Sequence, residues 1–104
     1  MPDPLLALTD IARSFDVSPP WLDRVLERKP RALLKAAKAM KHGMKYERGE
    51  GENWRGVPAE IHLDHALRHI ALWKQGHRSE DHVGHIGNRM LMWGELTEGG
   101  ADGE

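Results

Sequence analysis

The fold is decided by residues 59–93, AEIHLDHALRHIALWKQGHRSEDHVGHIGNRMLMW. Apolar residues recur there at the three- and four-residue spacing of helices, on either side of a short polar stretch. The pattern predicts a first helix from Ala59 to Gln75, ended by Gly76, and a second helix that takes Ser79 as its N-cap. A connection this short predicts that the two helices are antiparallel neighbours.

The two helices differ in how their apolar residues are distributed. The core face expected for the first helix consists of Leu63, Ala66, Leu67, Ile70 and Trp73. The second helix is apolar nearly all round, which predicts that it is buried.

Upstream of this pair, helical spacing predicts three shorter helices, over residues 4–15, from Ser18 as N-cap to Lys29, and from Arg31 to Met44. Tyr46 to Pro58 has no sustained period and is predicted to be one long loop. The sequence therefore predicts an all-α fold, a small bundle of four to five helices with a C-terminal antiparallel helix hairpin. Its expected divisions are an N-terminal helical extension over 1–28, the main helical domain over 29–97 and a disordered acidic tail over 98–104.

Length and composition limit the classes of function. With 104 residues, the chain has room for one core, and a homo-oligomer would supplement the modest stability of so small a domain. The absence of cysteine excludes thiolate metal sites, disulfides and thiol nucleophiles. No signal peptide or long apolar run is visible, which predicts a cytoplasmic protein with no membrane partner.

Charge is distributed unevenly, although the formal net charge is only -1. Residues 29–48 hold seven lysines and arginines against one acidic residue, Glu47. This segment is therefore a local cationic stripe, suited to contact with phosphate groups.

Six of the seven histidines lie between residues 62 and 85. In an antiparallel hairpin, His69 and His85 are equally distant from His77 and would lie at the same height, with Asp81 about one turn nearer the connection. Two imidazoles and a carboxylate suit a divalent ion. We therefore predict that His69, Asp81 and His85 hold Mn, Fe, Ni, Zn or Mg, with Glu80 as a further ligand or base. The alternative for each residue is a structural role, such as a buried polar network that fixes a dimer interface.

Asn53-Trp54-Arg55-Gly56, in the predicted loop, combines an aromatic surface, a guanidinium and flexible backbone. This combination suits the stacking of a base and the neutralisation of phosphate. The alternative is that Trp54 fills the core.

Several short motifs, taken together in order, resemble a known family. They are Lys29-Pro30-Arg31, Gly43-Met44-Lys45-Tyr46, Asn53-Trp54-Arg55, Ala66-Leu67-Arg68-His69, Glu80-Asp81, Gly84-His85 and Asn88. The chain resembles the bacteriophage family named for the N-terminal domain of dATP/dGTP diphosphohydrolases, over about residues 29–97. The resemblance implies a phage-encoded protein of the host cytoplasm, linked to deoxynucleotide metabolism. The all-α nucleotide pyrophosphohydrolases gather Mg²⁺ with Glu-x-x-Glu and Glu-x-x-Asp pairs on adjacent helices, and this chain has no such paired set.

The leading hypothesis is a nucleotide-binding domain or a metal-dependent deoxynucleotide hydrolase. Glu80 and Asp81 are the expected catalytic residues of such an enzyme. The residues expected to contact a purine deoxynucleotide are Lys45, Tyr46, Asn53, Trp54, Arg55, Arg68 and Asn88.

The competing hypothesis is a non-enzymatic phage module that binds nucleic acid or a host protein. Residues 11–25 fit the apolar spacing of a helix-turn-helix loosely. Residues 1–28 carry five acids against three bases, opposite to what phosphate contact requires, although the lysines of the helix predicted from Arg31 to Met44 could compensate.

Overall fold

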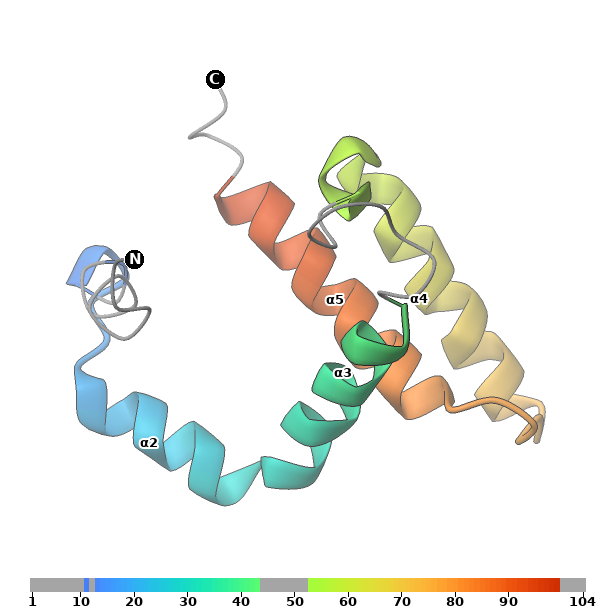
Figure 1. Cartoon of the computed structure of the whole chain (residues 1–104), viewed down its shortest axis with the longest axis horizontal. Coiled ribbons are helices and arrows are strands. Elements are labelled where there is room, and N and C mark those ends of the chain that lie inside the picture. Colours follow the sequence, from blue (N-terminus) through green and yellow to red (C-terminus); the bar gives the residue numbers. More distant parts are fainter. Residues whose placement is uncertain (1–10, 12, 44–52, 100–104) are drawn as a thin grey trace. The chain divides into compact units, whose positions relative to one another are not determined.

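The computed structural model describes residues 11, 13–43 and 53–99. Within these ranges the chain forms helices and no strand, so the all-α prediction is confirmed (Figure 1). The chain divides after Pro30 into two compact units. The described elements are α2 (Pro19–Arg28), α3 (Pro30–Gly43), the short 3-10 helix η2 (Asn53–Gly56), α4 (Ala59–Lys74) and α5 (His82–Glu98).

The first unit contributes α2, which begins where the sequence predicts. Ser18 is its N-cap with extended backbone, and Asp16 just before it has a positive φ of 57°. On α2 the Arg24 guanidinium lies over the Trp21 ring, 4.5 Å from its centroid. The helix predicted over residues 4–15 falls mostly outside the described residues.

The second unit contains α3, α4 and α5, and α4 packs along α5 (Figure 1). The face that α4 buries carries His62, Ala66 and His69, at the i, i+4 and i+7 positions of one helical stripe. The predicted core face is therefore wrong for Leu67, Ile70 and Trp73, which are 53%, 36% and 46% exposed. Two of the three side chains buried by α4 are imidazoles, which find hydrogen-bond partners on neighbouring elements.

α3 meets α5 through small residues. Ala36 and Ala39 are the buried residues of α3. A Cβ placed on Gly84 would lie 2.8 Å from the Lys35 carbonyl oxygen, and one on Gly87 would lie 3.2 Å from the Ala36 Cβ. Only residues without a side chain allow the α3 backbone to approach so closely, so this interface places the lysines of α3 beside the start of α5.

Two details of the sequence prediction need correction. Part of the long loop, Asn53–Gly56, is a 3-10 turn, while residues 44–52 lie outside the described ranges. The last helix begins at His82 with Asp81 as its N-cap, not at Ser79. Asp81 is the N-cap because its carboxylate accepts a hydrogen bond from the Gly84 N–H at 3.2 Å, whereas the Ser79 hydroxyl is hydrogen-bonded to His77.

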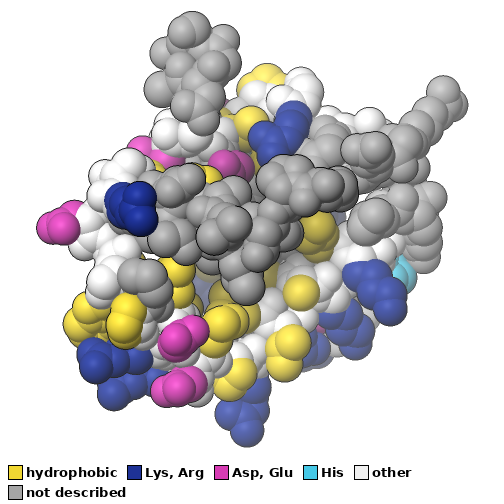
Figure 2. All heavy atoms as spheres, turned by 60° about the vertical axis from the view of Figure 1, so that its left-hand side comes forward, with side chains coloured by type: hydrophobic (Ala, Val, Ile, Leu, Met, Phe, Trp, Pro, Cys, Tyr) yellow, Lys and Arg dark blue, Asp and Glu magenta, His cyan; other side chains and the backbone are white. Residues whose placement is uncertain are grey.

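The surface carries many large apolar side chains, visible among the charged ones in Figure 2. On α4 and α5 of the second unit these include Leu67, Ile70, Trp73, Val83 and Leu91. The composition of α5 predicts burial all round, and this prediction is wrong, because only His82 and Gly84 of α5 are buried. None of the helices in the described ranges is long and apolar enough to span a bilayer.

Candidate functional site

The connection between α4 and α5 is shaped by a glycine. Gly76 has a φ of +91°, a left-handed conformation that L side chains rarely adopt. The Gly76 N–H donates to the Trp73 carbonyl and the His77 N–H to the Leu72 carbonyl, which together form a Schellman motif. Arg78 adds a hydrogen bond from Nη1 to the Trp73 carbonyl at 2.7 Å. The chain is thus turned sharply, with His77 leaving the turn at a fixed position.

Three imidazoles form a hydrogen-bonded chain across this connection. His77 Nδ1 lies 2.7 Å from His82 Nε2, and His82 Nδ1 lies 2.9 Å from His69 Nδ1. The chain ends at the Ser79 hydroxyl, 2.9 Å from His77 Nε2. His82 is only 2% exposed and uses both ring nitrogens, so it is the central member of the cluster.

His85 extends the cluster toward the surface. Its ring stacks on that of His69 with centroids 4.9 Å apart and an interplanar angle of 15°. Burial lowers the pKa of His69, and the neighbouring His85 and His82 lower it further, outweighing the opposite effect of Glu80. His69 is therefore a neutral imidazole at neutral pH, as its role within a chain of imidazole hydrogen bonds requires.

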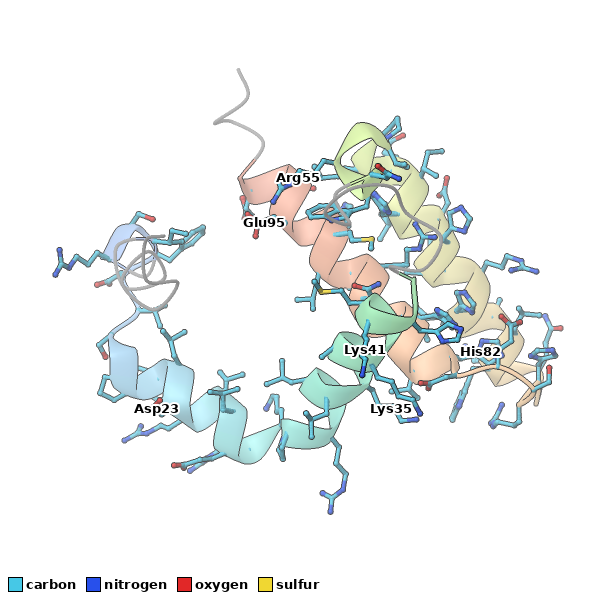
Figure 3. The ribbon with its side chains drawn as sticks, in the orientation of Figure 1. Asp23, Lys35, Lys41, Arg55, His82 and Glu95 are labelled. Carbon is cyan, nitrogen blue, oxygen red and sulfur yellow. The ribbon has the colours of Figure 1, made fainter. Side chains whose placement is uncertain are left out.

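Asp81 lies between the start of α5 and a lysine of α3. Its carboxylate accepts the Gly84 N–H and forms an ion pair with Lys35, with 3.3 Å between Oδ2 and Nζ. Burial alone would raise the pKa of Asp81, but the Gly84 N–H and the Lys35 and Lys38 ammonium groups outweigh burial and lower it. Asp81 is therefore an ionised carboxylate at neutral pH. Figure 3 shows Lys35 reaching from α3 toward the start of α5.

A cleft of about 510 Å³ opens beside this ion pair. We call it the Asp81 cleft. It brings two lysines of α3 opposite two acids that precede α5, so it can attract both an anion and the cation that accompanies it. Its lining residues are Lys35, Lys38, Ala39, His42, Glu80, Asp81 and His85.

At the other end of α4, His62 ties η2 to the helices. His62 is fully buried, and its Nδ1 accepts a hydrogen bond from Arg89 Nη1 of α5 at 2.9 Å. Its Nε2 then donates to the Trp54 carbonyl, also at 2.9 Å. The Trp54 indole meets the His62 ring edge-on, with centroids 6.2 Å apart. These contacts hold the aromatic residue of η2 in one position.

A second cleft, of about 360 Å³, lies beside η2. We call it the Trp54 cleft. It combines an indole, two amide side chains and a guanidinium with apolar side chains, which suits a flat heteroaromatic ring with polar edges. Its lining residues are Ala39, His42, Gly43, Asn53, Trp54, Val57, His62, His85, Asn88, Arg89 and Met92.

The two clefts have common walls. Ala39, His42 and His85 line both of them. His85 thus stands where an aromatic cleft meets a charged one, and both volumes fall in the range of small-molecule sites.

Several of the residues predicted from the sequence come together here. Asn53, Trp54 and Asn88 line the Trp54 cleft, and Glu80, Asp81 and His85 line the Asp81 cleft, with His69 stacked behind His85.

Other predicted residues lie elsewhere. Arg55 is exposed, with its guanidinium 4.5 Å from the centroid of the Trp54 ring. Arg68 is exposed on α4 and lines neither cleft. Lys45 and Tyr46 fall outside the described residues.

The site residues predicted from the sequence did not include His82, His77 and His62, nor the cleft-lining Lys35 and Lys38. The error at His82 follows from the error in the helix start. With Ser79 as N-cap, His82 would be an ordinary residue of the first turn. With Asp81 as N-cap, it is the first residue of α5, and its ring contacts His69 of α4. The sequence feature that could have indicated this histidine cluster is the succession of His77, His82 and His85.

Within the described residues, one group of three side chains has the spacing of a metal site. It consists of His77, Glu80 and His82, whose candidate ligand atoms all lie within 4.8 Å of one another. The predicted set of His69, Asp81 and His85 has its two imidazoles face to face, while Asp81 is engaged by Gly84 and Lys35. That assignment stays a prediction.

Comparison with protein families identifies the domain. A model described as dATP/dGTP diphosphohydrolase, N-terminal, matches residues 10–102. The chain belongs to this family. The family match begins well before residue 29, where the resemblance read from the motifs begins, so it also takes in α2. Comparison with curated proteins and with solved structures gives no match.

The family description names purine deoxynucleotides, which combine a heteroaromatic base with a chain of phosphates. In this member, the aromatic and charged clefts stand next to one another with His85 between them.

Proposed function

We propose that this domain binds a purine deoxynucleoside triphosphate across the two clefts and hydrolyses it with the help of a divalent ion. The observation that carries the proposal is that His85 lines both clefts. The Trp54 cleft offers an indole and amides, and the Asp81 cleft places lysines opposite acids. Such a pairing matches the two ends of a nucleotide.

The base would occupy the Trp54 cleft. Trp54 offers a ring for stacking, which contributes about 1–3 kcal/mol per base in comparable proteins. Asn53 and Asn88 offer amide donors and acceptors to the polar edges of a purine. Because His62 and Arg89 fix the position of η2, this surface is formed before the ligand arrives.

The phosphates would occupy the Asp81 cleft. Lys35 and Lys38 supply positive charge, and both side chains are exposed and able to move toward a ligand. Lys35 is already within 3.3 Å of Asp81, so a phosphate group would compete for the same ammonium. The predicted phosphate contacts of Lys45, Arg55 and Arg68, and the base contact of Tyr46, stay predictions.

The proposed reaction is hydrolysis of the bond between the α- and β-phosphates. Water adds to the α-phosphorus, the bond to the bridging oxygen breaks, and the products are the deoxynucleoside monophosphate and pyrophosphate. Glu80 is exposed at the rim of the Asp81 cleft, where it can accept the proton of the attacking water. A divalent ion bound there would neutralise charge on the phosphates, with Asp81, His85 and His69 as its predicted ligands.

A test begins with the four deoxynucleoside triphosphates, assayed with Mg²⁺ and Mn²⁺ for release of pyrophosphate and monophosphate. We expect dATP or dGTP to be hydrolysed. Removal of one positive charge by Lys35→Gln or by Lys38→Gln should weaken nucleotide binding roughly 10-fold or more. The reason is that a hydrogen bond to a charged group contributes about 1.5–3 kcal/mol.

Lys41→Gln is the matched control, since Lys41 is exposed on the same helix and lines neither cleft. Binding without turnover would leave a nucleotide-binding domain and exclude the hydrolase. Absence of both binding and turnover, or equal effects at Lys35, Lys38 and Lys41, would contradict the proposal.

The remaining features implied by the resemblance or by size are proposals of the same kind. They are a phage source, a location in the host cytoplasm and a homo-oligomeric state. Exposed apolar side chains such as Leu67, Trp73 and Leu91 support the last of these, because an interface between copies would remove them from water.

A further inference from the structure

The turn between α4 and α5 gathers more ligand chemistry than a connection needs. His77 leaves the Schellman motif, Glu80 follows it, and His82 opens α5. Their candidate ligand atoms lie within 4.8 Å of one another. His82 is buried, His77 is half-buried and Glu80 is exposed, so the group is closed on the protein side and open toward solvent.

The protons of this cluster can be arranged in two ways when the imidazoles are neutral. In one arrangement, a proton lies between His77 Nδ1 and His82 Nε2, which are 2.7 Å apart. In the other, His77 Nε2 donates to Ser79 Oγ and His82 Nδ1 donates to His69 Nδ1, at 2.9 Å each. The lone pairs of His77 Nδ1 and His82 Nε2 then face each other, and a cation between them makes this arrangement stable.

We propose that His77 Nδ1, His82 Nε2 and the Glu80 carboxylate bind a divalent transition-metal ion, with Zn²⁺ as the ion that fits best. Two imidazoles and one carboxylate form a three-ligand set that leaves a fourth tetrahedral position for water. Imidazole ligands favour zinc and its first-row neighbours over Mg²⁺ and Ca²⁺, which prefer oxygen.

The surroundings match what such an ion demands. A ligating histidine usually donates its other ring N–H to an acceptor, which fixes its tautomer and orientation. Both outer partners are in place here, Ser79 for His77 and His69 for His82. Two nitrogens bound at about 2.0–2.1 Å to tetrahedral zinc lie about 3.3 Å apart. The pair at 2.7 Å therefore needs to open by roughly 0.6 Å, which the half-exposed His77 can do without disturbing α4 or α5.

This site differs from the set predicted from the sequence and does not depend on nucleotide binding. His69 changes role, from ligand to acceptor of the His82 N–H, and it stacks on His85 at the junction of the two clefts. Glu80 lines the Asp81 cleft, so the ion would sit at the rim of that cleft, with Glu80 as its ligand in place of the role as base in the proposed hydrolysis. The ion would hold the connection between α4 and α5 in the conformation that positions both His69 and Glu80.

The test is metal binding by the full chain after chelator treatment and desalting, with no nucleotide present. Zn²⁺ is titrated by calorimetry, and Co²⁺ is used as a visible-absorbing probe of coordination. We expect one ion per chain and a higher unfolding temperature when the ion is bound. His77→Ala should weaken Zn²⁺ binding by more than about 100-fold, since loss of an outer partner alone costs 10–100-fold.

Glu80→Gln is the second variant, because an exposed side chain can be changed without unfolding the domain. It should weaken Zn²⁺ binding and alter the Co²⁺ spectrum. His65→Ala and His85→Gln are the controls, and both should retain one ion.

Three results would overturn the proposal. They are no stoichiometric ion in the wild-type protein, retention of the ion by both His77→Ala and Glu80→Gln, and loss of the ion in His85→Gln alone. The last result would favour the set that includes His69 and Asp81. Since nucleotide is absent from every measurement, failure of this site and failure of the proposed hydrolase would be told apart.

Discussion

Replacing Gly84 by alanine should destabilise the domain, although alanine is the better helix former. Gly84 lies in the first turn of α5, at the point of closest approach to α3. A Cβ on this residue would lie 2.7 Å from Asp81 Oδ2 and 2.8 Å from the Lys35 carbonyl oxygen. The carbonyl belongs to the α3 backbone and cannot rotate away, so the helices must separate or the Asp81 carboxylate must move.

The expected magnitude follows from opposing contributions. Removing a glycine from a helix interior stabilises by about 1 kcal/mol. Forcing a methyl group into a closely packed contact costs about 1–3 kcal/mol, and loss of the Asp81 N-cap costs about 1 kcal/mol more. The net effect of Gly84→Ala is a loss of roughly 1–3 kcal/mol in the free energy of unfolding.

Gly94→Ala is the matched control in the same helix. A Cβ at Gly94 meets nothing within 4 Å, so this variant should gain about 0.5–1 kcal/mol. Urea unfolding followed by circular dichroism measures both. The two variants should differ by roughly 1.5–4 kcal/mol, and Gly84→Ala should also weaken nucleotide binding by displacing Lys35 from Asp81. A Gly84→Ala protein as stable as Gly94→Ala would refute the close approach of α3 and α5.

Two further predictions concern histidines of α4. His62→Ala should cost roughly 2–4 kcal/mol in unfolding experiments, because it leaves a cavity and removes the partners of Arg89 and the Trp54 carbonyl. The Trp54 indole resonance should shift in the same variant, and an unchanged stability would argue against the buried hydrogen bonds. Partial desolvation, and then the Arg89 guanidinium, lower the pKa of His65 below its ordinary value of 6.5. The unfolded chain therefore binds this proton more readily, and stability falls as pH drops below 6.5 toward the pKa of the folded state. His65→Gln should lose less stability than the wild type between neutral and mildly acidic pH, and an identical pH dependence would show that His65 contributes nothing.

The sequence predicted the bounds of α2, α3 and α4 well because those bounds depend on local chemistry. Gly76 ends α4 through a backbone conformation that only glycine adopts at little cost, and Ser18 precedes α2 as expected. The start of α5 was harder. Ser79 and Asp81 are both good N-caps, and the choice between them was settled by Gly84 and by Lys35 on another helix.

The faces of α4 could not be predicted from periodicity. Leu67 and Trp73 have more to gain from leaving water than His62 or His69, yet they are the exposed residues. His62 is buried because η2 and α5 provide partners for both of its ring nitrogens, and His69 is buried with His82 of α5 as the partner of its Nδ1. Such partners are distant in sequence, so hydrophobic spacing alone cannot predict them.

Residues that line a cleft could be singled out from the sequence where one side chain carries its own chemistry, but not where the position of a pair decides. Trp54 and Asn88 line a cleft, as their side chains suggest. Lys35 and Lys38 are two of the seven basic residues in the cationic stripe, and only their position opposite Asp81 distinguishes them from Lys41.

The most direct test of the central claim is amide chemical-shift mapping by NMR while dATP or dGTP is added to the isotopically labelled protein. We expect saturable shifts at residues of both clefts, including Lys35 and Trp54, with His85 affected by either end of the ligand. Shifts confined to α2, or no saturable shifts at all, would contradict a nucleotide site that spans His85.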